Sequence, residues 1–335
     1  MQALNILLSS VAAARFQSEI ARTLGELPYR LLTPDDADGG DAQIAFVSRD
    51  VTGRSTKYEL TEETHRFYDT MLAAPHLRWV HAHSAGIDRP VYLELLQRGV
   101  RVTTSAGANA RTVAHSALAG LLALARRLPL MYDAQREHAW RPLLAEAAPR
   151  DLAGQTAVVV GYGAIGQRIA KLLDALEMNV IVVRRDTVAD RAEDAFPRML
   201  AFDALDSVLP QADWLVLACP LTPQTKRLLD AERLSLLPSG AHLINVARGE
   251  IVVETDLIAA LRDKALAGAY LDVFEHEPLN ADSPLWDLPD VIVTPHTAGQ
   301  SDSHYEAVGR IWLDNLARWV RDEQLINEVQ AQEGR

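Results

Sequence analysis

A glycine-rich stretch over residues 157–185 constrains the fold more than any other part of the chain. A short apolar strand that ends at Val160 runs directly into Gly161, Gly163 and Gly166, whose spacing is G-x-G-x-x-G. The first glycine permits a tight strand-to-helix turn, the second lets a pyrophosphate approach the backbone, and the third lets the helix pack closely on the strand. This arrangement is typical of a dinucleotide site.

The residues after the glycines complete a strand–helix–strand unit. Apolar side chains recur at helical spacing, and a second strand is expected over residues 180–183. A helix that begins at the glycines points its free N–H groups and its positive dipole end at the phosphates. The first cofactor contacts are therefore expected at Gly161, Gly163, Ala164, Ile165 and Gly166.

The residue that ends the second strand indicates which dinucleotide binds. An acid usually stands there and bonds the ribose 2′-OH of NAD, whereas this chain has Arg184 followed by Arg185. A guanidinium accommodates the 2′-phosphate of NADP, which a carboxylate would repel. The alternative is that both arginines are merely exposed to solvent. The nearby acid Asp186 is compatible with a site that also accepts NAD. We expect NADP(H) to be preferred, with NAD(H) possible.

The length, hydrophobic content, net charge and cysteine count limit the number of domains and the kinds of partner. A chain of 335 residues with 48% hydrophobic content is long enough for two cores of ordinary domain size. The formal net charge of -12 argues against nucleic acid and against an anionic membrane surface as partners, since both attract basic patches. The single cysteine, Cys219, fits a reducing compartment, so we expect a cytoplasmic protein with no membrane partner.

Strand and helix signals alternate along the chain, which predicts two parallel-sheet α/β domains. Before the glycine-rich stretch, strands are expected over residues 4–8, 29–32, 44–47, 77–80 and 100–103. After it, strands are expected over residues 214–218, 242–246, 269–271 and 291–294. A final helix is expected over residues 301–320, with Ala307, Ile311, Leu316 and Trp319 facing inward.

A long helix expected over residues 109–128 is apolar on most sides and must therefore be buried. It could pack inside one domain. It could instead join the two domains and also form a dimer seam. We favour the second arrangement and expect a homodimer.

Three polar residues, Arg248, Glu277 and His296, follow successive predicted strands, where ligands bind in open α/β sheets. Reduction of a 2-oxo acid needs a cation to hold the carboxylate, a hydride source, and an acid that protonates the nascent alkoxide. In this scheme Arg248 is the clamp, His296 is the proton donor, and Glu277 holds the imidazole in its tautomer. Taken singly, each residue also has an ordinary structural explanation.

A loop of small residues over positions 84–88, Ser-Ala-Gly-Ile-Asp, follows a predicted strand in the first half of the chain. Its backbone N–H groups could cradle a carboxylate, although a plain turn explains the composition equally well. Nearby, His76, His81 and His83 are not completed by cysteine or carboxylate ligands, so no metal site is expected.

Five motifs in order make the chain resemble the D-isomer-specific 2-hydroxyacid dehydrogenase family over essentially its whole length. They are GYGAIG at 161–166, CPLTPQT at 219–225, NVARGEIV at 245–252, GAYLDVFEHEPL at 268–279 and TPHTAG at 294–299. The resemblance implies two doubly wound parallel-sheet domains, with a Rossmann nucleotide-binding domain inserted in a flavodoxin-like substrate domain. In this sequence the substrate domain would be 1–104 plus 301–335, and the Rossmann domain 105–300.

The resemblance also assigns roles to individual positions. It makes Arg248, Glu277 and His296 the catalytic set, and it favours carboxylate binding by the small-residue loop. The substrate pocket, for a small 2-oxo or 2-hydroxy acid, would contain Ala85, Gly86 and Asn109. Further cofactor contacts would be Cys219, Pro220, Thr225, Val246, Ala247, Arg248, Asp272, His296, Ala298 and Gly299.

Three positions depart from the family pattern. Residues 113–115 read Val-Ala-His where relatives usually have Val-Ala-Glu, and residues 252–254 read Val-Val-Glu where Val-Asp-Glu is frequent. The third departure is Arg184, which is similar to the NADPH-using glyoxylate and hydroxypyruvate reductase branches.

We therefore expect an NADP(H)-preferring 2-oxo acid reductase that forms the D-hydroxy acid. One alternative is a non-catalytic, nucleotide-sensing scaffold similar to the transcriptional corepressors related to this family. A second alternative is a dehydrogenase of a small anion such as phosphite. Formate is less favoured, because formate dehydrogenases of the family resemble each other in having Gln where this chain has Glu277.

Overall fold

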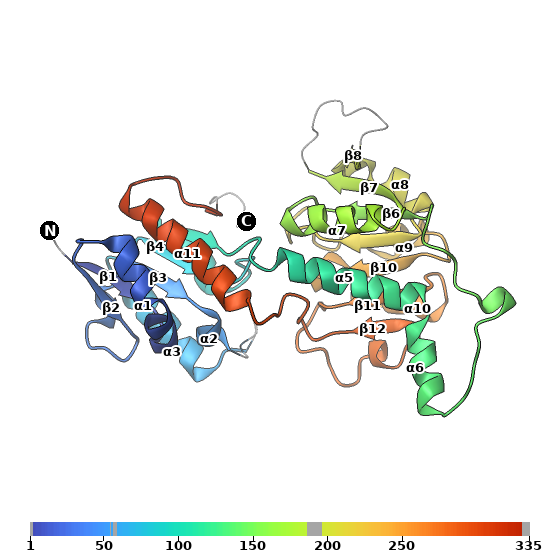
Figure 1. Ribbon diagram of the computed structural model, residues 1–335, viewed down its shortest axis with the longest axis horizontal. Coiled ribbons are helices and arrows are strands. Elements are labelled where there is room, and N and C mark those ends of the chain that lie inside the picture. Colours follow the sequence, from blue (N-terminus) through green and yellow to red (C-terminus); the bar gives the residue numbers. More distant parts are fainter. Residues whose placement is uncertain (1–2, 54, 56–58, 186–195, 330–335) are drawn as a thin grey trace. The chain divides into compact units, whose positions relative to one another are not determined.

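The computed structural model describes residues 3–53, 55, 59–185 and 196–329, and the chain forms two α/β units (Figure 1). The first unit runs to Asn109 and resumes at Ser301, and the second unit spans Ala110–Gln300. The second unit is therefore inserted in the first. Its first boundary lies five residues beyond the position expected from the sequence, because the chain continues past the last strand of the first sheet before α5 begins.

The first unit contains a five-stranded parallel sheet in the order β2-β1-β3-β4-β5. Its strands are β1 (Leu4–Leu7), β2 (Tyr29–Leu32), β3 (Ile44–Val47), β4 (Trp79–Ala82) and β5 (Arg101–Thr104). Strand β4 begins two residues later than residue 77, where we expected it. Leu77 is buried, but its N–H bonds the carbonyl of Ala74 in a turn, so it adds apolar area without joining the sheet. As a result His81 lies inside the strand.

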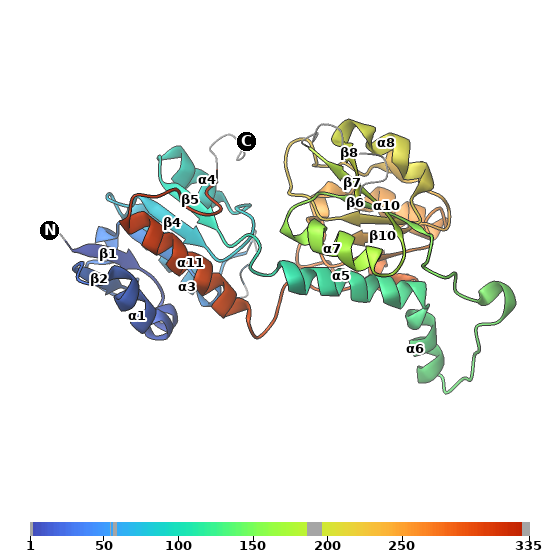
Figure 2. The ribbon, with the colours of Figure 1, turned by 45° about the horizontal axis from the view of Figure 1, so that its top comes forward.

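Helices cover both faces of this sheet, because neighbouring strand residues point to opposite faces. The helices are α1 (Ser10–Leu24), α2 (Arg49–Thr52), α3 (Glu62–Ala73), α4 (Pro90–Gln97) and α11 (His304–Val320). Helices α1 and α11 contact each other on one face, so the last helix of the chain returns to the first unit (Figures 1 and 2).

The buried stripe of α11 differs from the expected one. Val308, Trp312 and Leu316 are buried, and the Trp312 ring stacks on Phe46 at a centroid distance of 4.5 Å. Ala307 and Ile311, which we expected to face inward, are only partly buried. The stripe repeats every four residues from Val308, which turns the positions one residue earlier away from the core.

The second unit contains a seven-stranded parallel sheet in the order β12-β11-β10-β9-β6-β7-β8. Its strands are β6 (Thr156–Val160), β7 (Asn179–Arg184), β8 (Arg198–Ala201), β9 (Trp214–Leu217), β10 (His242–Asn245), β11 (Gly268–Leu271) and β12 (Val291–Val293). Strand β8 was not expected from the sequence. It is a short edge strand with no fully buried residue, so it carries no strong apolar signal.

Helices of the second unit pack on both faces of its sheet. They are α5 (Ala110–Ala125), α7 (Ala164–Asp174), α8 (Leu205–Val208), α9 (Ala231–Ser235) and α10 (Glu254–Arg262). Helix α6 (Leu128–Arg136) follows α5 and contacts it. None of the helices in the described ranges is long and apolar enough to cross a bilayer.

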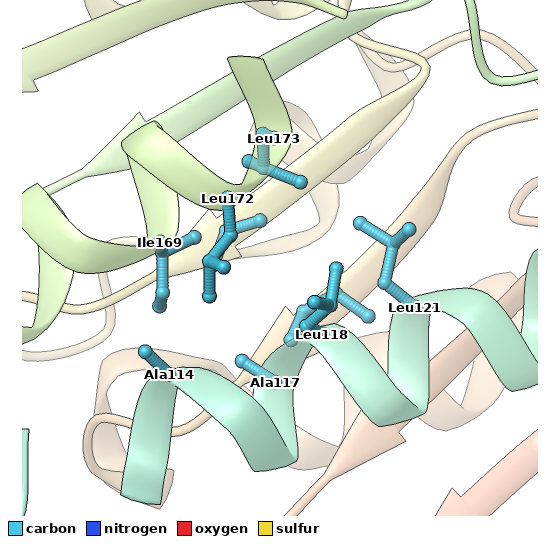
Figure 3. Close-up of a pocket in the computed structure, with 9 residues that line it drawn as sticks. Ala114, Ala117, Leu118, Leu121, Ile169, Leu172 and Leu173 are labelled. Carbon is cyan, nitrogen blue, oxygen red and sulfur yellow. The ribbon is translucent and has the colours of Figure 1, made fainter. Parts of the chain in front are cut away.

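The helix expected over residues 109–128 is shorter and is followed by a second helix. Arg127 has a left-handed φ of 53°, and Pro129 stands in the first turn of α6, which is incompatible with a continuous helix. Helix α5 lies wholly in the second unit and packs there against α7 and strands β10 and β11, so it takes the first of the two arrangements considered rather than joining the two units, which we had favoured. Figure 3 shows this packing through Ala114, Ala117, Leu118 and Leu121 of α5 and Ile169, Leu172 and Leu173 of α7.

Candidate active site

Three predicted catalytic residues lie at one edge of the seven-stranded sheet. Arg248 follows β10, Glu277 follows β11 and His296 follows β12, and these strands are neighbours in the sheet. Because parallel strands end at the same edge, all three side chains come from its carboxyl edge. This edge, with its loops, is the candidate active site.

His296 and Glu277 form a direct hydrogen bond, with 2.8 Å between His296 Nδ1 and Glu277 Oε2. The other carboxylate oxygen, Oε1, accepts from the Phe274 N–H at 3.1 Å. An ionised carboxylate only accepts hydrogen bonds, so His296 carries a hydrogen on Nδ1. The Nε2 atom is then the one available for proton exchange. The His296 side chain is 51% exposed and that of Glu277 is 21% exposed. The imidazole is therefore accessible to solvent, while the acid that it contacts is half-buried.

A buried carboxylate, Asp272, organises the loop that carries His296. It accepts hydrogen bonds from Thr294 Oγ1 at 2.6 Å and from the Thr297 and Ala298 N–H groups at 2.9 and 3.0 Å. Burial raises the pKa of Asp272, and these three donors oppose that shift. His296 itself has a left-handed φ of 52°, and its N–H donates to the Asp272 carbonyl at 2.8 Å. Hydrogen bonds to Asp272 from residues before and after His296, and from His296 itself, therefore fix the backbone that carries the imidazole.

The loop that carries Arg248 is held by Asn245, the buried last residue of β10. Asn245 Nδ2 donates to the Arg248 carbonyl at 3.1 Å, and Asn245 Oδ1 accepts from the Ala247 N–H at 3.1 Å. Arg248 Nη1 donates to the Ala247 carbonyl at 2.7 Å. Our sequence interpretation gave Asn245 no role of its own. The signal available was an amide side chain at the end of an otherwise apolar strand.

Glu254 connects α10 to the loop that carries Glu277. Its Oε2 accepts from the Glu275 N–H at 3.1 Å, and burial raises the pKa of Glu254. The sequence marked residues 252–254 only as a departure from the family pattern. The structure shows that the acid at 254 supports the loop that carries Glu277.

In the glycine loop after β6, two positions admit only glycine for steric reasons, and a third has room for a side chain. Gly161 has φ 103°, and a Cβ there would lie 2.7 Å from the Ala218 backbone. A Cβ on Gly166 would lie 2.1 Å from the Gly161 carbonyl oxygen, whereas one on Gly163 would meet nothing within 4 Å. Gly163 is the N-cap of α7 and has no side chain to bond the first N–H groups of the helix. These features fit a dinucleotide phosphate.

The remaining predicted cofactor positions also lie along this edge or beside it. Ala164 and Ile165 form the first turn of α7, Cys219 and Pro220 follow β9, Val246 and Ala247 follow β10, and Ala298 and Gly299 follow the His296 loop. Thr225 Oγ1 donates to the Pro220 carbonyl at 2.7 Å, so its hydroxyl shapes the loop after β9. Burial raises the pKa of the Cys219 thiol to about 12, which makes it an inert packing group.

Arg184 is the last residue of β7 and is half-buried, and Arg185 follows it on the surface. Strand β7 pairs in parallel with β6, and the glycine loop follows β6. Both arginines therefore lie at the same edge of the sheet as the glycine loop. Asp186, the residue that left room for NAD, is outside the described residues.

The predicted substrate residues belong to the first unit. Ala85 and Gly86 follow β4, where Ser84 Oγ donates to the Gly86 carbonyl at 2.6 Å and Ala85 is exposed. Asn109 is the last residue of the first unit before α5. The structure thus brings Glu277 and His296 into contact and places Ala85, Gly86 and Asn109 in the other unit. In the described ranges, no group of three or more His, Cys, Asp or Glu residues is arranged to hold a metal ion.

A parallel sheet with a glycine loop, a helix N-terminus and a His–Glu pair at its carboxyl edge defines a dinucleotide-dependent oxidoreductase. The family model described as "D-isomer specific 2-hydroxyacid dehydrogenase, NAD binding domain" matches residues 118–298, which is more than half of the chain. The chain belongs to the D-isomer-specific 2-hydroxyacid dehydrogenase family.

Individual relatives agree with this assignment. The glyoxylate reductase of Pyrococcus horikoshii is 34% identical over 256 residues, which cover 75% of each protein. A D-isomer-specific 2-hydroxyacid dehydrogenase from Xanthobacter autotrophicus, solved with NADPH and MES, has 29% identity and a TM-score of 0.77, with all of both chains covered. A D-lactate dehydrogenase from Aquifex aeolicus, solved with NAD and lactic acid, has 26% identity and a TM-score of 0.72, with 95% of this chain and 96% of the other covered.

Proposed function

We propose that the protein reduces a 2-oxo acid to the D-2-hydroxy acid, with residues 110–300 as the nucleotide-binding domain and the other unit as the substrate domain. The observation that carries this proposal is the 2.8 Å contact between His296 and Glu277 at the same sheet edge as the glycine loop. A histidine paired in this way can give a proton to a developing alkoxide and recover it in the reverse direction.

Each residue has a defined task in this reaction. The Arg248 guanidinium binds the substrate carboxylate. The Ala85 and Gly86 amides are the carboxylate-binding groups that the family resemblance assigns to the substrate domain. His296 Nε2 donates its proton to the carbonyl oxygen, and Glu277 stabilises the charged imidazole before transfer. Bound nicotinamide would supply the hydride to substrate C2.

A panel assay with purified protein tests this proposal. NADPH or NADH oxidation is followed with glyoxylate, hydroxypyruvate, pyruvate and phenylpyruvate, and phosphite is tested with NADP and NAD. Turnover of a 2-oxo acid is expected. Turnover of phosphite alone would support the small-anion alternative. If no substrate reacts while NADPH still binds, the nucleotide-sensing scaffold becomes the better explanation.

We also propose that NADPH is preferred over NADH, and Arg184→Asp tests this preference. The substitution removes a charge-assisted contact to the 2′-phosphate and places a carboxylate against it, so kcat/KM for NADPH should fall about 10- to 100-fold. The ratio of kcat/KM values for NADPH and NADH is the measurement. Arg262→Asp, with the same charge change at an exposed position on α10, should leave the ratio unchanged. An unchanged ratio in Arg184→Asp would show that this residue does not read the 2′-phosphate.

We further propose a cytoplasmic homodimer in which α6 and the segment after it contact a second copy of the chain. Figures 1 and 2 show this green segment extending away from the sheet of its own unit. It carries exposed apolar side chains, with Tyr132 55%, Leu144 69% and Trp140 96% exposed. Large apolar groups on an extension cannot be buried by their own unit, and an identical partner would cover them.

Replacing Trp140 and Leu144 together by serine should convert the dimer to a monomer. If the pair contributes about 2 kcal/mol per copy, the two-fold symmetric loss weakens association about a thousandfold. Sedimentation velocity over a concentration series measures the change. Val11→Ser, at an apolar position of α1 that is 52% exposed, is the matched control. A dimer of unchanged affinity in the double variant would refute this interface.

A further inference from the structure

Four nitrogen-bearing side chains gather beyond the carboxyl edge of the five-stranded sheet. Arg49 lies two residues after β3, His83 directly follows β4, Arg89 precedes α4, and His304 begins α11. All four belong to the first unit. None of them has a role in the reaction described above.

His83 is the buried centre of this group. It is 7% exposed, and its Nε2 bonds Thr52 Oγ1 at 2.8 Å. Its Nδ1 is buried and has no hydrogen-bond partner within the described residues. The ring of His304 lies edge-on at a centroid distance of 6.5 Å, and its Nδ1 is also buried and unpartnered there. Arg89 Nη2 donates to the Ser55 carbonyl at 2.6 Å, whereas its buried Nη1 has no partner in the described ranges.

His81, two residues earlier, shows how a purely structural histidine differs. Its Nδ1 bonds Thr103 Oγ1 at 2.7 Å and its Nε2 bonds Ser105 Oγ at 2.9 Å, so both ring nitrogens are satisfied. Burial alone lowers the pKa of His81 to about 3. His83 is also buried but has an open ring nitrogen, which points to a missing ligand.

The charged members of the group are the guanidinium groups of Arg49 and Arg89, and burial disfavours the charged form of both histidines. Burial lowers the pKa of His83 to about 3, and the next causes are the positive charges of Arg49, His304 and Arg89. Burial and then Arg49 lower the pKa of His304. Burial and then Arg89 lower the pKa of Arg49. Among the described groups, only cations contribute to these three shifts besides burial.

The neighbouring acids are bound to other groups. Asp50 Oδ1 accepts from Tyr305 Oη at 2.8 Å and from Ser48 Oγ at 2.7 Å. Glu306 accepts from Arg15 Nε at 2.8 Å. The hydrogen bonds of these two carboxylates therefore go to Tyr305, Ser48 and Arg15 and not to the four residues of the group.

The position of the group in the chain connects it to the substrate. His83 immediately precedes the small-residue loop with Ala85 and Gly86, for which the proposed function assigns carboxylate binding. The group also includes the first residue of α11, a helix of 17 residues whose N-cap side chain makes no capping hydrogen bond. A helix N-terminus with free N–H groups adds to the attraction for an anion. Arg49 is exposed and Arg89 and His304 are half-buried, so solvent reaches the group.

We propose that Arg49, His83, Arg89 and His304 bind a second anionic group of the substrate, a carboxylate or a phosphate. The preferred substrates are then 2-oxo acids that carry a further negative group, and this inference rests on the proposed function. The small-residue loop, which belongs to the same unit as the group, holds the carboxylate next to the reacting carbonyl. The four-residue subsite holds the far end of the molecule.

Kinetics with paired substrates test the subsite. Oxaloacetate and 3-phosphohydroxypyruvate carry a second carboxylate and a phosphate, respectively, and pyruvate carries neither. Wild-type protein should show at least a tenfold higher kcat/KM for one of the two dianions than for pyruvate, and the better one identifies the anionic group. Arg49→Gln should lower that ratio by about tenfold or more, and Arg49→Lys should lower it less.

Arg66→Gln is the matched control, because Arg66 is an exposed arginine of the same unit that pairs with Asp35 at 2.6 Å. It should leave the ratio unchanged. If Arg49→Gln does not fold, as judged by circular dichroism and thermal melting, His304→Gln repeats the measurement. Turnover of 2-oxo acids with no preference for either dianion, or with a ratio unaffected by these variants, would overturn the subsite.

A binding measurement separates failure of the subsite from failure of the proposed function. If no 2-oxo acid reacts, the proposed function fails, and inorganic phosphate and malonate are titrated while histidine-ring NMR signals are recorded. Saturable shifts of the His83 and His304 signals, lost in Arg49→Gln, would still support an anion subsite. Absence of saturable shifts with both probes would overturn it.

Discussion

Replacement of His296 by asparagine is expected to lower kcat for 2-oxo acid reduction about a thousandfold, the usual scale for loss of a positioned general acid. Asparagine is preferred to alanine because His296 has a left-handed φ of 52°, which asparagine tolerates. The backbone of the loop should therefore persist, together with the Asp272 hydrogen bonds that hold it. Steady-state turnover and the dissociation constant of NADPH are the two measurements.

NADPH binding should change far less than turnover in this variant, because His296 acts on the substrate oxygen in the proposed mechanism. Glu277→Gln should give a smaller loss, since a neutral amide can still accept from Nδ1 but stabilises the charged imidazole less. His276→Asn is the matched control, at an exposed histidine next to the catalytic acid in sequence. Equal losses of turnover and NADPH affinity in His296→Asn would contradict the proton-donor role.

The strand ends and the glycine loop could be predicted because their signals are local. Apolar runs mark the buried parallel strands, and the G-x-G-x-x-G spacing marks the turn that only glycine allows at Gly161. Arg184 falls at the end of β7 as expected, because the strand before it is continuously apolar. Elements without such signals were missed or misplaced, including the edge strand β8 and the break between α5 and α6.

The contact between Glu277 and His296 could not be read from the sequence without the family resemblance. Glu277 and His296 are 19 residues apart and meet only because two loops fold toward each other. The loop that carries His296 is shaped by Asp272 and the loop that carries Glu277 by Glu254, and both side chains accept hydrogen bonds from backbone N–H groups. Such side-chain-to-backbone bonds leave no periodic pattern, so the residue types alone do not reveal them.

The loops that carry Arg248 and Glu277 also touch each other, and Gly249 is the contact point. A Cβ on Gly249 would lie 1.8 Å from the Phe274 carbonyl carbon and 2.0 Å from its oxygen. The obstacle is backbone, so no side-chain rotation can relieve it. Phe274 also donates its N–H to Glu277 Oε1 at 3.1 Å. The absence of a side chain at 249 is therefore a condition for placing both Arg248 and Glu277.

Gly249→Ala should consequently destabilise the protein and impair catalysis together. Forced separation of the two loops should lower the free energy of unfolding by about 3 kcal/mol, as overpacking does. A displacement of about 1 Å in either catalytic loop should lower kcat/KM about a hundredfold. Thermal or denaturant unfolding and steady-state kinetics measure the two effects.

Gly240→Ala separates this steric effect from the general effect of replacing glycine. A Cβ on Gly240 would meet no atom within 4 Å, so that variant should keep wild-type activity and gain up to about 1 kcal/mol by restricting the unfolded chain. If Gly249→Ala is stable but inactive, the loops have separated without loss of the core, and Arg248 and Glu277 depend on this contact for position alone. If Gly249→Ala matches Gly240→Ala in activity and stability, the Phe274 backbone can shift to accommodate the added Cβ. The spacing of the loops that carry Arg248 and Glu277 must then be set by Asn245 and Glu254 instead.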